Sequence, residues 1–336
     1  MKSTHTMDRR AFLKLAGSAG IAAGLPLVSP AIGLASLNRQ LKVAQASRMM
    51  MGTVVAVTVV DPSPARAQEA MSLAFKRMEE LTPIFDRHSG SGPLRLLNSE
   101  GRVQDLSPDF KRVLGLCRQV HQLTGGAFDI TVAPIIDAYK KSFAAGRKPA
   151  AKDIKAALAA VGGLRIEADG LVLTREGAGV TLDGVAKGFI ADQGLHAARK
   201  AGAQSALINA GGDVAVMGDA GGRPWRVAVA DPAQPTKAKT LVEMTSGALA
   251  TSGNYEVYFD RDKLFHHIVN PSTGRSPRTD TSASVRAPQA AMADAMSTAC
   301  FVMRPFGAMR LIKAQNLEGL IYTRHKQKYA TEGFWG

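Results

Sequence analysis

The chain has 336 residues, of which 46% are hydrophobic and 21% charged, and its formal net charge is +14. This composition is that of an ordinary globular protein and argues against the fibrous and intrinsically disordered classes. A basic protein attracts phosphorylated ligands, nucleic acid or anionic lipid, but this sequence has no basic run interleaved with aromatic residues, so we predict no nucleic-acid partner.

Residues 1–46 are predicted to be a signal peptide. Arg9 and Arg10 precede a weakly apolar run over 15–28, and the pair resembles a twin-arginine export signal, although Asp8 stands where Ser or Thr is usual. Glycines and a proline interrupt the run, so it is a poor candidate to span a membrane. Cleavage is predicted after Ala44-Gln-Ala46, with Gly33-Leu-Ala35 as the other candidate. We therefore expect a periplasmic protein that does not itself span the membrane, with a mature domain over 47–336.

The mature chain is predicted to alternate helices, strands and hairpins irregularly. Helices are expected at 67–81, from Ser107 to Gly125, and at 152–161, 188–200, 291–300 and 306–315. Strands are expected at 51–60, 206–209, 225–230, 239–244, 248–259, 319–323 and 328–334, with a hairpin over 164–174 and a segment at 284–287 that leads into the helix at 291–300. Residues 85–98 are expected to form a loop, and 127–134 an extended stretch that Pro134 ends. This pattern favours a mixed α+β fold of largely antiparallel sheets and packed helices, with a ligand cleft between two lobes, over a doubly wound parallel sheet.

The two cysteines, Cys117 and Cys300, lie among apolar residues of predicted helices. Buried free thiols are the commoner explanation for such positions, but an oxidising compartment leaves a disulfide open. Their spacing indicates neither zinc nor haem binding.

The predicted helix over 291–300 places Asp294, Ser297 and Thr298 on one face, because residues three and four apart are neighbours on a helix. A carboxylate and two hydroxyls on an otherwise Ala- and Met-rich helix would be costly in a core without a partner. A hard cation such as Mg²⁺ or Ca²⁺ would bind all three oxygens at once. The other interpretation, a capping or solvated polar face, stays open from this stretch alone.

Glycine-flanked polar segments around Asp129, Lys187, Asp213 and His267 lie at predicted ends of helices and strands. The helix that starts near Lys187 offers unpaired N–H groups to phosphate oxygens. No phosphate-binding loop, dinucleotide-binding glycine motif or hydrolase nucleophile elbow is present. A phosphate site, a hard-cation site and a histidine in a turn are typical of metal-assisted transfer or hydrolysis at phosphorus.

Over residues 49–335 the chain resembles the FAD:protein FMN transferases, the ApbE-like flavin transferases. Seven motifs that occur in the family's order support the resemblance. The seven together are far more specific than any one of them. They are Met51-Gly-Thr53, Gly126-Ala-Phe-Asp-Ile-Thr131 with Pro134, Ala186-Lys-Gly-Phe-Ile-Ala-Asp192, Asn209-Ala-Gly-Gly-Asp213, Thr251-Ser-Gly-Asn-Tyr255, His267-Ile-Val-Asn-Pro-Ser-Thr-Gly274 and Ala293-Asp-Ala-Met-Ser-Thr298.

The resemblance implies an enzyme that binds FAD and Mg²⁺, cleaves the pyrophosphate and attaches FMN through a phosphoester to a Thr or Ser of an acceptor protein, releasing AMP. The acceptor would belong to a membrane-linked electron-transfer system. The implied metal ligands are Asp294, Thr298, Ser297 and the carbonyl of Gly184. The implied FAD contacts are Met51, Ala127, Phe128, Asp129, Thr181, Lys187 and Ile268. His267 is the candidate proton-handling group, while a histidine that only hydrogen-bonds the turn is the competing interpretation.

Two departures from the family pattern concern the FAD site. His88 stands near a position that is commonly tyrosine, with Gly92-Pro93 in place of a Ser-Glu pair, and Thr181 stands where the family is often acidic. Asp129 and Asp213 also have a structural interpretation as turn or capping residues. Two other functions remain as hypotheses, namely a metal-dependent FAD pyrophosphatase and a periplasmic flavin-binding protein without turnover.

Overall fold

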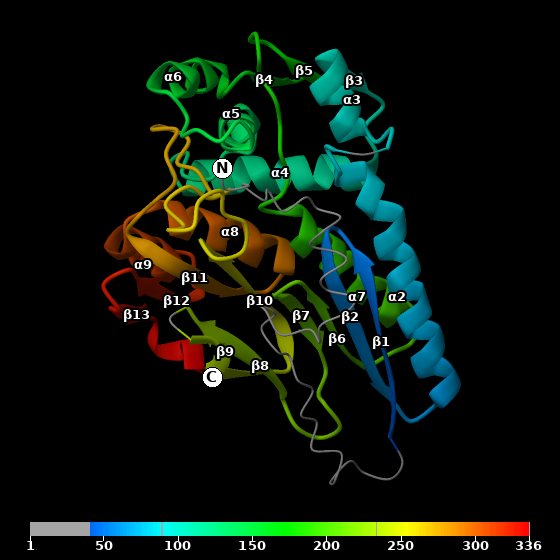
Figure 1. The fold of residues 1–336 in the computed structure, drawn as a ribbon. Helices are drawn as coiled ribbons and strands as arrows, with labels where there is room; N and C mark the ends of the chain where they lie inside the picture. The colour runs from blue at the N-terminus through cyan, green and yellow to red at the C-terminus, as the bar shows by residue number, and fades with distance from the viewer. Residues whose placement is uncertain (1–40, 89, 233, 336) are drawn as a thin grey trace, which may run out of the picture.

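The computed structural model describes residues 41–88, 90–232 and 234–335 (Figure 1). Within these ranges the chain forms eight α-helices and three antiparallel sheets of eight, three and two strands. The mixed α+β fold with antiparallel sheets is therefore confirmed. The greater part of the predicted signal peptide, residues 1–40, lies outside the described residues.

The eight-stranded sheet organises the fold, in the order β1-β2-β6-β7-β10-β11-β12-β13. Its strands are β1 (Lys42–Met50), β2 (Thr53–Asp61), β6 (Ser205–Ala210), β7 (Asp213–Met217), β10 (Ser246–Gly253), β11 (Asp280–Ala287), β12 (Glu318–Thr323) and β13 (Lys328–Ala330). The central strands are buried on both faces, which is why β2 and β7 are continuous runs of apolar residues rather than alternating ones.

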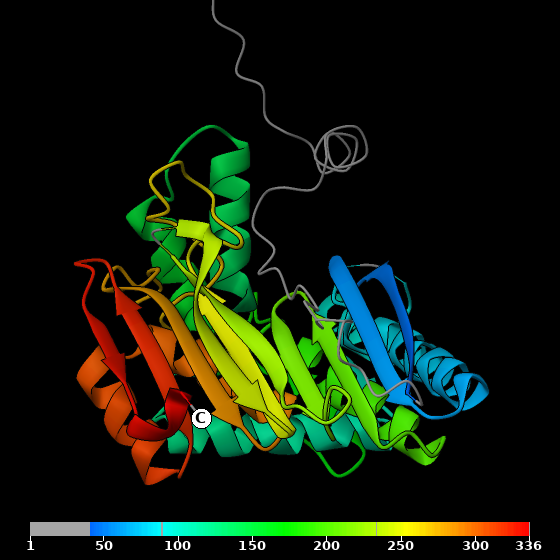
Figure 2. The same ribbon diagram turned by 90° about the horizontal axis from the view of Figure 1, so that it is seen from below.

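Helices cover one face of this sheet (Figure 2). These are α2 (Pro64–Phe85), α7 (Ala186–Lys200), α8 (Ala290–Val302) and α9 (Pro305–Ala314), with α4 (Pro108–Leu123) beyond them. Helix α8 lies inside this layer and is buried on nearly every side, as expected for a helix that is apolar all round. Its few polar side chains must therefore find partners in the interior.

The opposite face of the sheet packs against the hairpin of β8 (Trp225–Asp231) and β9 (Gln234–Met244). Valines of this hairpin join residues such as Val214 and Val216 of β7 in a second apolar cluster, which Phe334 of the C-terminal 3₁₀ helix (Glu332–Trp335) completes. The main sheet is thus the middle layer of three.

A smaller part of the molecule sits at the end of the helical layer (Figure 1). It contains α3 (Pro93–Glu100), α5 (Ala133–Ala144), α6 (Ala151–Ala160) and a sheet of β3 (Arg102–Gln104), β5 (Gly170–Leu173) and β4 (Leu164–Ile166). A third apolar cluster, which includes Ile135, Tyr139 and Val269, joins α5 and α6 to the segment after β10. The strands β4 and β5 confirm the predicted hairpin over 164–174.

Two predicted irregular segments are helical instead. Pro134 does not end an extended stretch but lies in the first turn of α5, after a 3₁₀ turn at Ile130–Val132, and Pro93 likewise opens α3. Proline is favoured at the first helical position because it has no N–H to leave unpaired there. Each of these prolines begins a helix, although the sequence pattern was equally consistent with a proline that ends an extended segment or lies in a loop.

Strand β1 was not predicted, and it begins at Lys42, before the predicted signal-peptide boundary at residue 46. Its pairing with β2 runs from Lys42–Asp61 to Met50–Thr53, so cleavage after Ala46 would remove half of the edge strand. Cleavage after Ala35 would leave the strand whole.

Each helix in the described part of the chain is too short or too polar to span a bilayer. Both cysteines are buried and free, which is the first of the two alternatives that the sequence left open.

Candidate functional site

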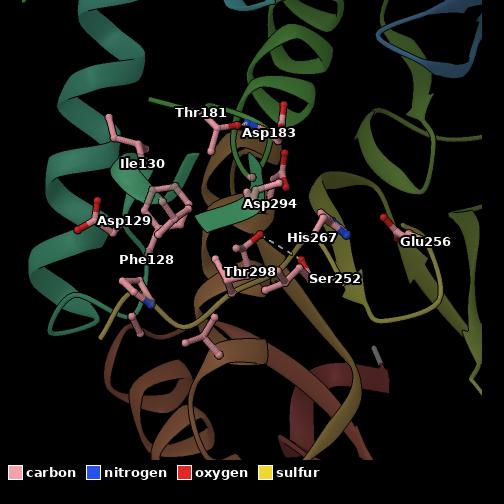
Figure 3. Close-up of a pocket in the computed structure, with 18 of the residues that line it drawn as sticks. Phe128, Asp129, Ile130, Thr181, Asp183, Ser252, Glu256, His267, Asp294 and Thr298 are labelled. Atoms are coloured by element: carbon pink, nitrogen blue, oxygen red, sulfur yellow. Dashed lines mark hydrogen bonds between the residues drawn. The ribbon is translucent and has the colours of Figure 1, made fainter. Parts of the chain in front are cut away.

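A pocket that is partly open to solvent lies where α7 and α8 meet α5 and the segment after β10. Figure 3 shows its lining side chains. Its walls include the predicted residues Ala127, Phe128, Asp129, Thr181, Gly184, Lys187, His267, Ile268, Asp294 and Thr298. The fold therefore brings together residues separated by more than 150 positions in sequence.

Helix α8 supplies Asp294 and Thr298, which lie one turn apart and both face the pocket (Figure 3). Asp294 is 3% exposed, and its Oδ2 accepts a hydrogen bond from the N–H of Gly188 at 3.1 Å. A Cβ atom on Gly184 would lie 3.0 Å from Oγ1 of Thr298, so the Gly184 segment packs directly against this hydroxyl. Asp294, Thr298 and Gly184 thus line one corner of the pocket.

Ser297 does not line the pocket. Its hydroxyl is fully buried, donates to the carbonyl of Asp294 at 2.9 Å and pairs with the Ser252 hydroxyl at 2.8 Å. Ser252 also pairs with Thr298 at 3.1 Å. Because its oxygen already pairs with the Asp294 carbonyl and the Ser252 hydroxyl, we leave Ser297 out of the proposed ligand set.

Lys187 of α7 links two buried carboxylates. Its Nζ lies 3.0 Å from Oδ2 of Asp213 and 3.9 Å from Oδ2 of Asp294. Burial acts to lower the pKa of Lys187, but the charges of Asp213, Asp294 and Glu256 outweigh it and raise that pKa, so the lysine stays protonated. Burial, followed by the negative charge of Asp213, raises the pKa of Asp294 well above its usual range.

Asp192, at the end of the Lys187 motif, positions α8. Its two carboxylate oxygens accept hydrogen bonds from the N–H groups of Ala290 and Ala291, at 2.8 and 2.9 Å. Gly188 allows this close approach, because a Cβ there would overlap the carbonyl of Ala290. Motif residues of α7 therefore fix the start of the helix that holds Asp294.

The first turn of α7 is less open to a phosphate than predicted. The N–H of Ala186 bonds to the carbonyl of Leu182 and that of Gly188 to Asp294. The N–H of Lys187 is left as the first-turn donor with no partner among the described residues. The prediction of several free N–H groups is therefore wrong, because the neighbouring carboxylate and the preceding turn use them.

Asp129 lines the pocket and also holds the local turn. Its Oδ1 accepts hydrogen bonds from the N–H and the hydroxyl of Thr131, at 2.8 and 2.6 Å. It caps the 3₁₀ turn before α5, so the structural role considered from sequence is present beside any contact with a ligand. The Thr181 hydroxyl likewise accepts from the N–H of Asp183 at 3.3 Å.

Two residues assigned to FAD binding by resemblance, or placed near its site, lie elsewhere. Met51 is at the turn between β1 and β2, packs partly buried against the main core, and is not among the pocket residues. His88 is exposed and lies 3.5 Å from Lys140 rather than in the pocket wall.

A short hairpin after β10 forms the other wall. His267 lines the pocket, and both its N–H and its Nδ1 lie close to the carbonyl of Val257, at 3.1 and 3.0 Å. Donation by Nδ1 leaves Nε2 as the basic nitrogen. Burial lowers the pKa of His267 below its ordinary 6.5, so the ring is neutral at pH 7.

Two acidic pocket residues were missed by the sequence analysis. Glu256 follows the Thr251–Tyr255 motif directly, and Asp183 lies inside the segment that leads to Lys187. The Glu256 side chain is exposed to the pocket, yet the surrounding protein atoms raise the pKa of its carboxyl to about 7. The only sequence signal that could have placed Glu256 or Asp183 in the pocket is that each lies next to, or within, a segment already assigned to the site.

The donor set fits a hard cation better than a soft one. Among the described residues no group of three or more His, Cys, Asp and Glu side chains could hold a metal ion. Asp294, Thr298 and the Gly184 carbonyl would instead offer a carboxylate, a hydroxyl and a peptide oxygen, which are ligands of Mg²⁺ or Ca²⁺. One lysine faces the carboxyl groups of Asp213, Asp294 and Glu256, so a divalent cation would offset a surplus of negative charge.

The fold and the pocket together define an α+β ligand-binding protein whose site combines a lysine paired with buried carboxylates, hard oxygen donors and a neutral histidine. The family is defined by sequence: the ApbE family model matches residues 51–321, and the chain belongs to that family.

Curated relatives agree with this assignment. The FAD:protein FMN transferase of Haemophilus influenzae is 26% identical over 334 residues, covering 92% of this chain and 94% of that protein. The FAD:protein FMN transferase of Rhodobacter capsulatus is 32% identical, over 75% of this chain and 50% of that protein. These names support the prediction that the chain is an enzyme of this kind.

Solved structures agree on the fold. The crystal structure of the ApbE protein from Thermotoga maritima matches with a TM-score of 0.80 and 25% identity, over 88% of this chain and all of that one. The flavin transferase ApbE from Vibrio cholerae matches with a TM-score of 0.75.

Proposed function

We propose that this protein is a Mg²⁺-dependent FAD:protein FMN transferase that forms a phosphoester between FMN and a Thr or Ser of an acceptor protein and releases AMP. The transferase activity is supported by the family and its curated relatives. The observation that supports the finer chemistry is the meeting, in one pocket, of Asp294 and Thr298 with Lys187 and His267.

Asp294, Thr298 and the Gly184 carbonyl would hold the metal ion. When bound, Mg²⁺ would neutralise pyrophosphate charge and favour departure of AMP. Lys187 keeps the adjacent carboxylates Asp213 and Asp294 in place, and its positive charge faces the same space as the pyrophosphate would. Ala127, Phe128 and Ile268 provide the apolar surface for the rest of the ligand.

His267 is the proposed proton acceptor. The acceptor hydroxyl oxygen bonds to the phosphorus of the FMN half, the bond from that phosphorus to the bridging oxygen breaks, and the bridging oxygen leaves with AMP. Nε2 of His267 takes the hydroxyl proton and returns it to solvent. Because burial holds the pKa of His267 below its ordinary value, the ring is in its basic form at neutral pH.

We also propose export to the periplasm by the twin-arginine route, with cleavage after Ala35 rather than Ala46. The supporting observation is that β1 begins at Lys42 and pairs along its whole length with β2. N-terminal sequencing of the exported protein distinguishes the two sites, and a mature N-terminus at residue 47 would contradict this choice.

The test of function is incubation of the protein with FAD, Mg²⁺ and a flavin-free soluble domain of a membrane-linked electron-transfer protein that normally holds FMN on threonine. We expect an FMN-sized mass increase on the acceptor with equimolar AMP. An acceptor whose modified threonine is replaced by valine is the control and should gain no mass. Equal FMN and AMP release with and without acceptor would favour a pyrophosphatase, and tight FAD binding without AMP would favour a flavin carrier.

A further inference from the structure

Ser252 is a polar residue on the helix-facing side of the main sheet. It lies near the end of β10, and because side chains alternate along a strand it faces the same way as Ala248 and Ala250 of the main core. Helix α8 packs against this strand. A buried hydroxyl there costs free energy unless it is hydrogen-bonded. Ser252 is buried, and both of its hydroxyl partners, Ser297 and Thr298, belong to α8.

The hydroxyl groups of Thr298, Ser252 and Ser297 form a hydrogen-bonded chain whose direction is fixed at one end. Each hydroxyl has a single proton to donate. Ser297 donates its proton to the carbonyl of Asp294 at 2.9 Å, because a carbonyl oxygen can only accept. The 2.8 Å contact between Ser297 and Ser252 must then use the Ser252 proton. In the 3.1 Å contact between Ser252 and Thr298 the donor is therefore Thr298 (Figure 3).

This direction decides what the Thr298 oxygen offers to the pocket. Its proton points to Ser252, and its lone pairs have no hydrogen-bond partner among the residues that the structure describes. The same oxygen lies in the corner that Asp294 and Gly184 also line. A cation is attracted by the lone pairs of a hydroxyl and repelled by its proton, so a threonine with its proton in this corner would be a poor ligand.

We propose that Ser252 is a positioning residue for the metal site, because it accepts the Thr298 proton and so leaves the threonine oxygen free to bind a divalent cation. This inference rests on the Mg²⁺ site of the proposed function and gives a role to a residue outside the ligand set. The competing explanation is that Ser252 only fills the space between β10 and α8. In that case its loss would cost stability and leave the affinity for the metal ion unchanged.

Metal binding by the protein alone distinguishes the two explanations. Mn²⁺ takes the same hard oxygen ligands as Mg²⁺, and electron paramagnetic resonance measures the fraction that stays free. We expect Ser252→Ala to raise the Kd for Mn²⁺ about tenfold, as for the loss of a residue that orients a metal ligand. Ser252→Thr keeps a hydroxyl and should recover most of the affinity.

Ser284→Ala is the matched control. Ser284 is a fully buried serine of the neighbouring strand β11, and its hydroxyl pairs with that of Thr251 at 2.8 Å, so the substitution also breaks a hydroxyl pair of the sheet. It has no contact with Thr298 and should keep the wild-type Kd for Mn²⁺. FAD binding in the presence of EDTA, followed by flavin fluorescence, should be that of the wild type in every variant.

Ser297→Ala tests the far end of the chain. It removes the acceptor of the Ser252 proton but leaves Ser252 in place as an acceptor for Thr298. We therefore expect a weaker effect on the Kd for Mn²⁺ than that of Ser252→Ala, and nearly full activity at saturating Mg²⁺.

The proposal is overturned if Ser252→Ala keeps the wild-type Kd for Mn²⁺, or if Ser284→Ala weakens Mn²⁺ binding equally. A loss of FAD binding in EDTA would show a general change in the pocket and would also count against it. Each of these results leaves FMN transfer by the wild type untouched. Conversely, a wild type that attaches no FMN, but whose Mn²⁺ affinity falls with Ser252→Ala, would refute the proposed function and keep the role of Ser252.

Discussion

The two walls of the pocket differ in burial and in how their side chains are held in place. The charged wall joins the buried Asp213 and Asp294 to Lys187, which is 27% exposed, and its side chains are held by one another and by a backbone N–H. The hairpin wall, residues 256–267, is half-exposed, and its histidine is held by a single carbonyl. A buried charge cluster keeps its geometry without a ligand, whereas an open hairpin can receive a second macromolecule.

In the proposed reaction the two walls therefore have different roles. The charged wall would bind the metal ion and pyrophosphate, so changes there should abolish chemistry or stability. The hairpin wall would handle the hydroxyl, so changes there should affect the acceptor and the proton.

The largest effect is expected for Asp294→Ala, which removes the carboxylate that would hold Mg²⁺. We expect Mg²⁺-dependent adduct formation to fall by about a thousandfold or more, equivalent to about 4 kcal/mol of transition-state stabilisation. Mass spectrometry of the acceptor measures it. Ser297→Ala, three residues along the same helix but outside the pocket, is the control and should keep most activity; wild-type rates in Asp294→Ala would refute the metal assignment.

Lys187→Met should lower the free energy of unfolding by about 3 kcal/mol, because it leaves Asp213 and Asp294 buried without a counter-charge. Urea denaturation measures this loss. The matched control is Lys200→Met, at the exposed C-terminal end of α7, where loss of a favourable helix-dipole interaction costs at most about 1 kcal/mol. Equal effects of the two substitutions would show that the charged wall does not depend on its lysine.

His267→Gln should lower kcat by about a hundredfold, as for loss of a general base. The sign of the pH dependence follows from the lowered pKa of His267: the neutral ring is kept as pH falls from 8 to 7 and is lost only below the ordinary 6.5. With saturating Mg²⁺, wild-type kcat should be flat from pH 8 to 7 and fall below pH 6.5. The variant should lack that fall, and a variant with an unchanged pH profile would exclude His267 as the base.

The smallest effect is expected for Asp192→Ala, which removes the cap from the first N–H groups of α8. Loss of such a cap costs about 1 kcal/mol, and thermal unfolding should show it. Because α8 positions Asp294, the apparent affinity for Mg²⁺ should weaken as well, by a few fold. Asp192→Asn keeps an acceptor oxygen and should recover part of the lost stability and part of the lost Mg²⁺ affinity. An unchanged Mg²⁺ affinity in Asp192→Ala would show that the cap on α8 does not position the metal site.

Much of the site could be predicted from sequence because its residues lie in local motifs. Asp294 and Thr298 share a face by helical periodicity alone, and Lys187 follows a glycine-containing turn that had to begin a helix. The assignments of Ser297 and Met51 came from the same motifs. The Ser297 hydroxyl pairs with the Ser252 hydroxyl, and Met51 packs against the main core. Neither contact follows from the local motif that suggested the residue.

The sequence by itself determined the family, the α+β class and the helices whose apolar periodicity is strong, since these depend on local spacing. Tertiary structure alone decided that Asp192 caps α8, that Asp213 pairs with Lys187, and that Glu256 and Asp183 line the pocket. Such contacts join residues up to about a hundred positions apart. Local propensity does not encode a partner so distant, because that partner is chosen only when the sheet and the helices pack.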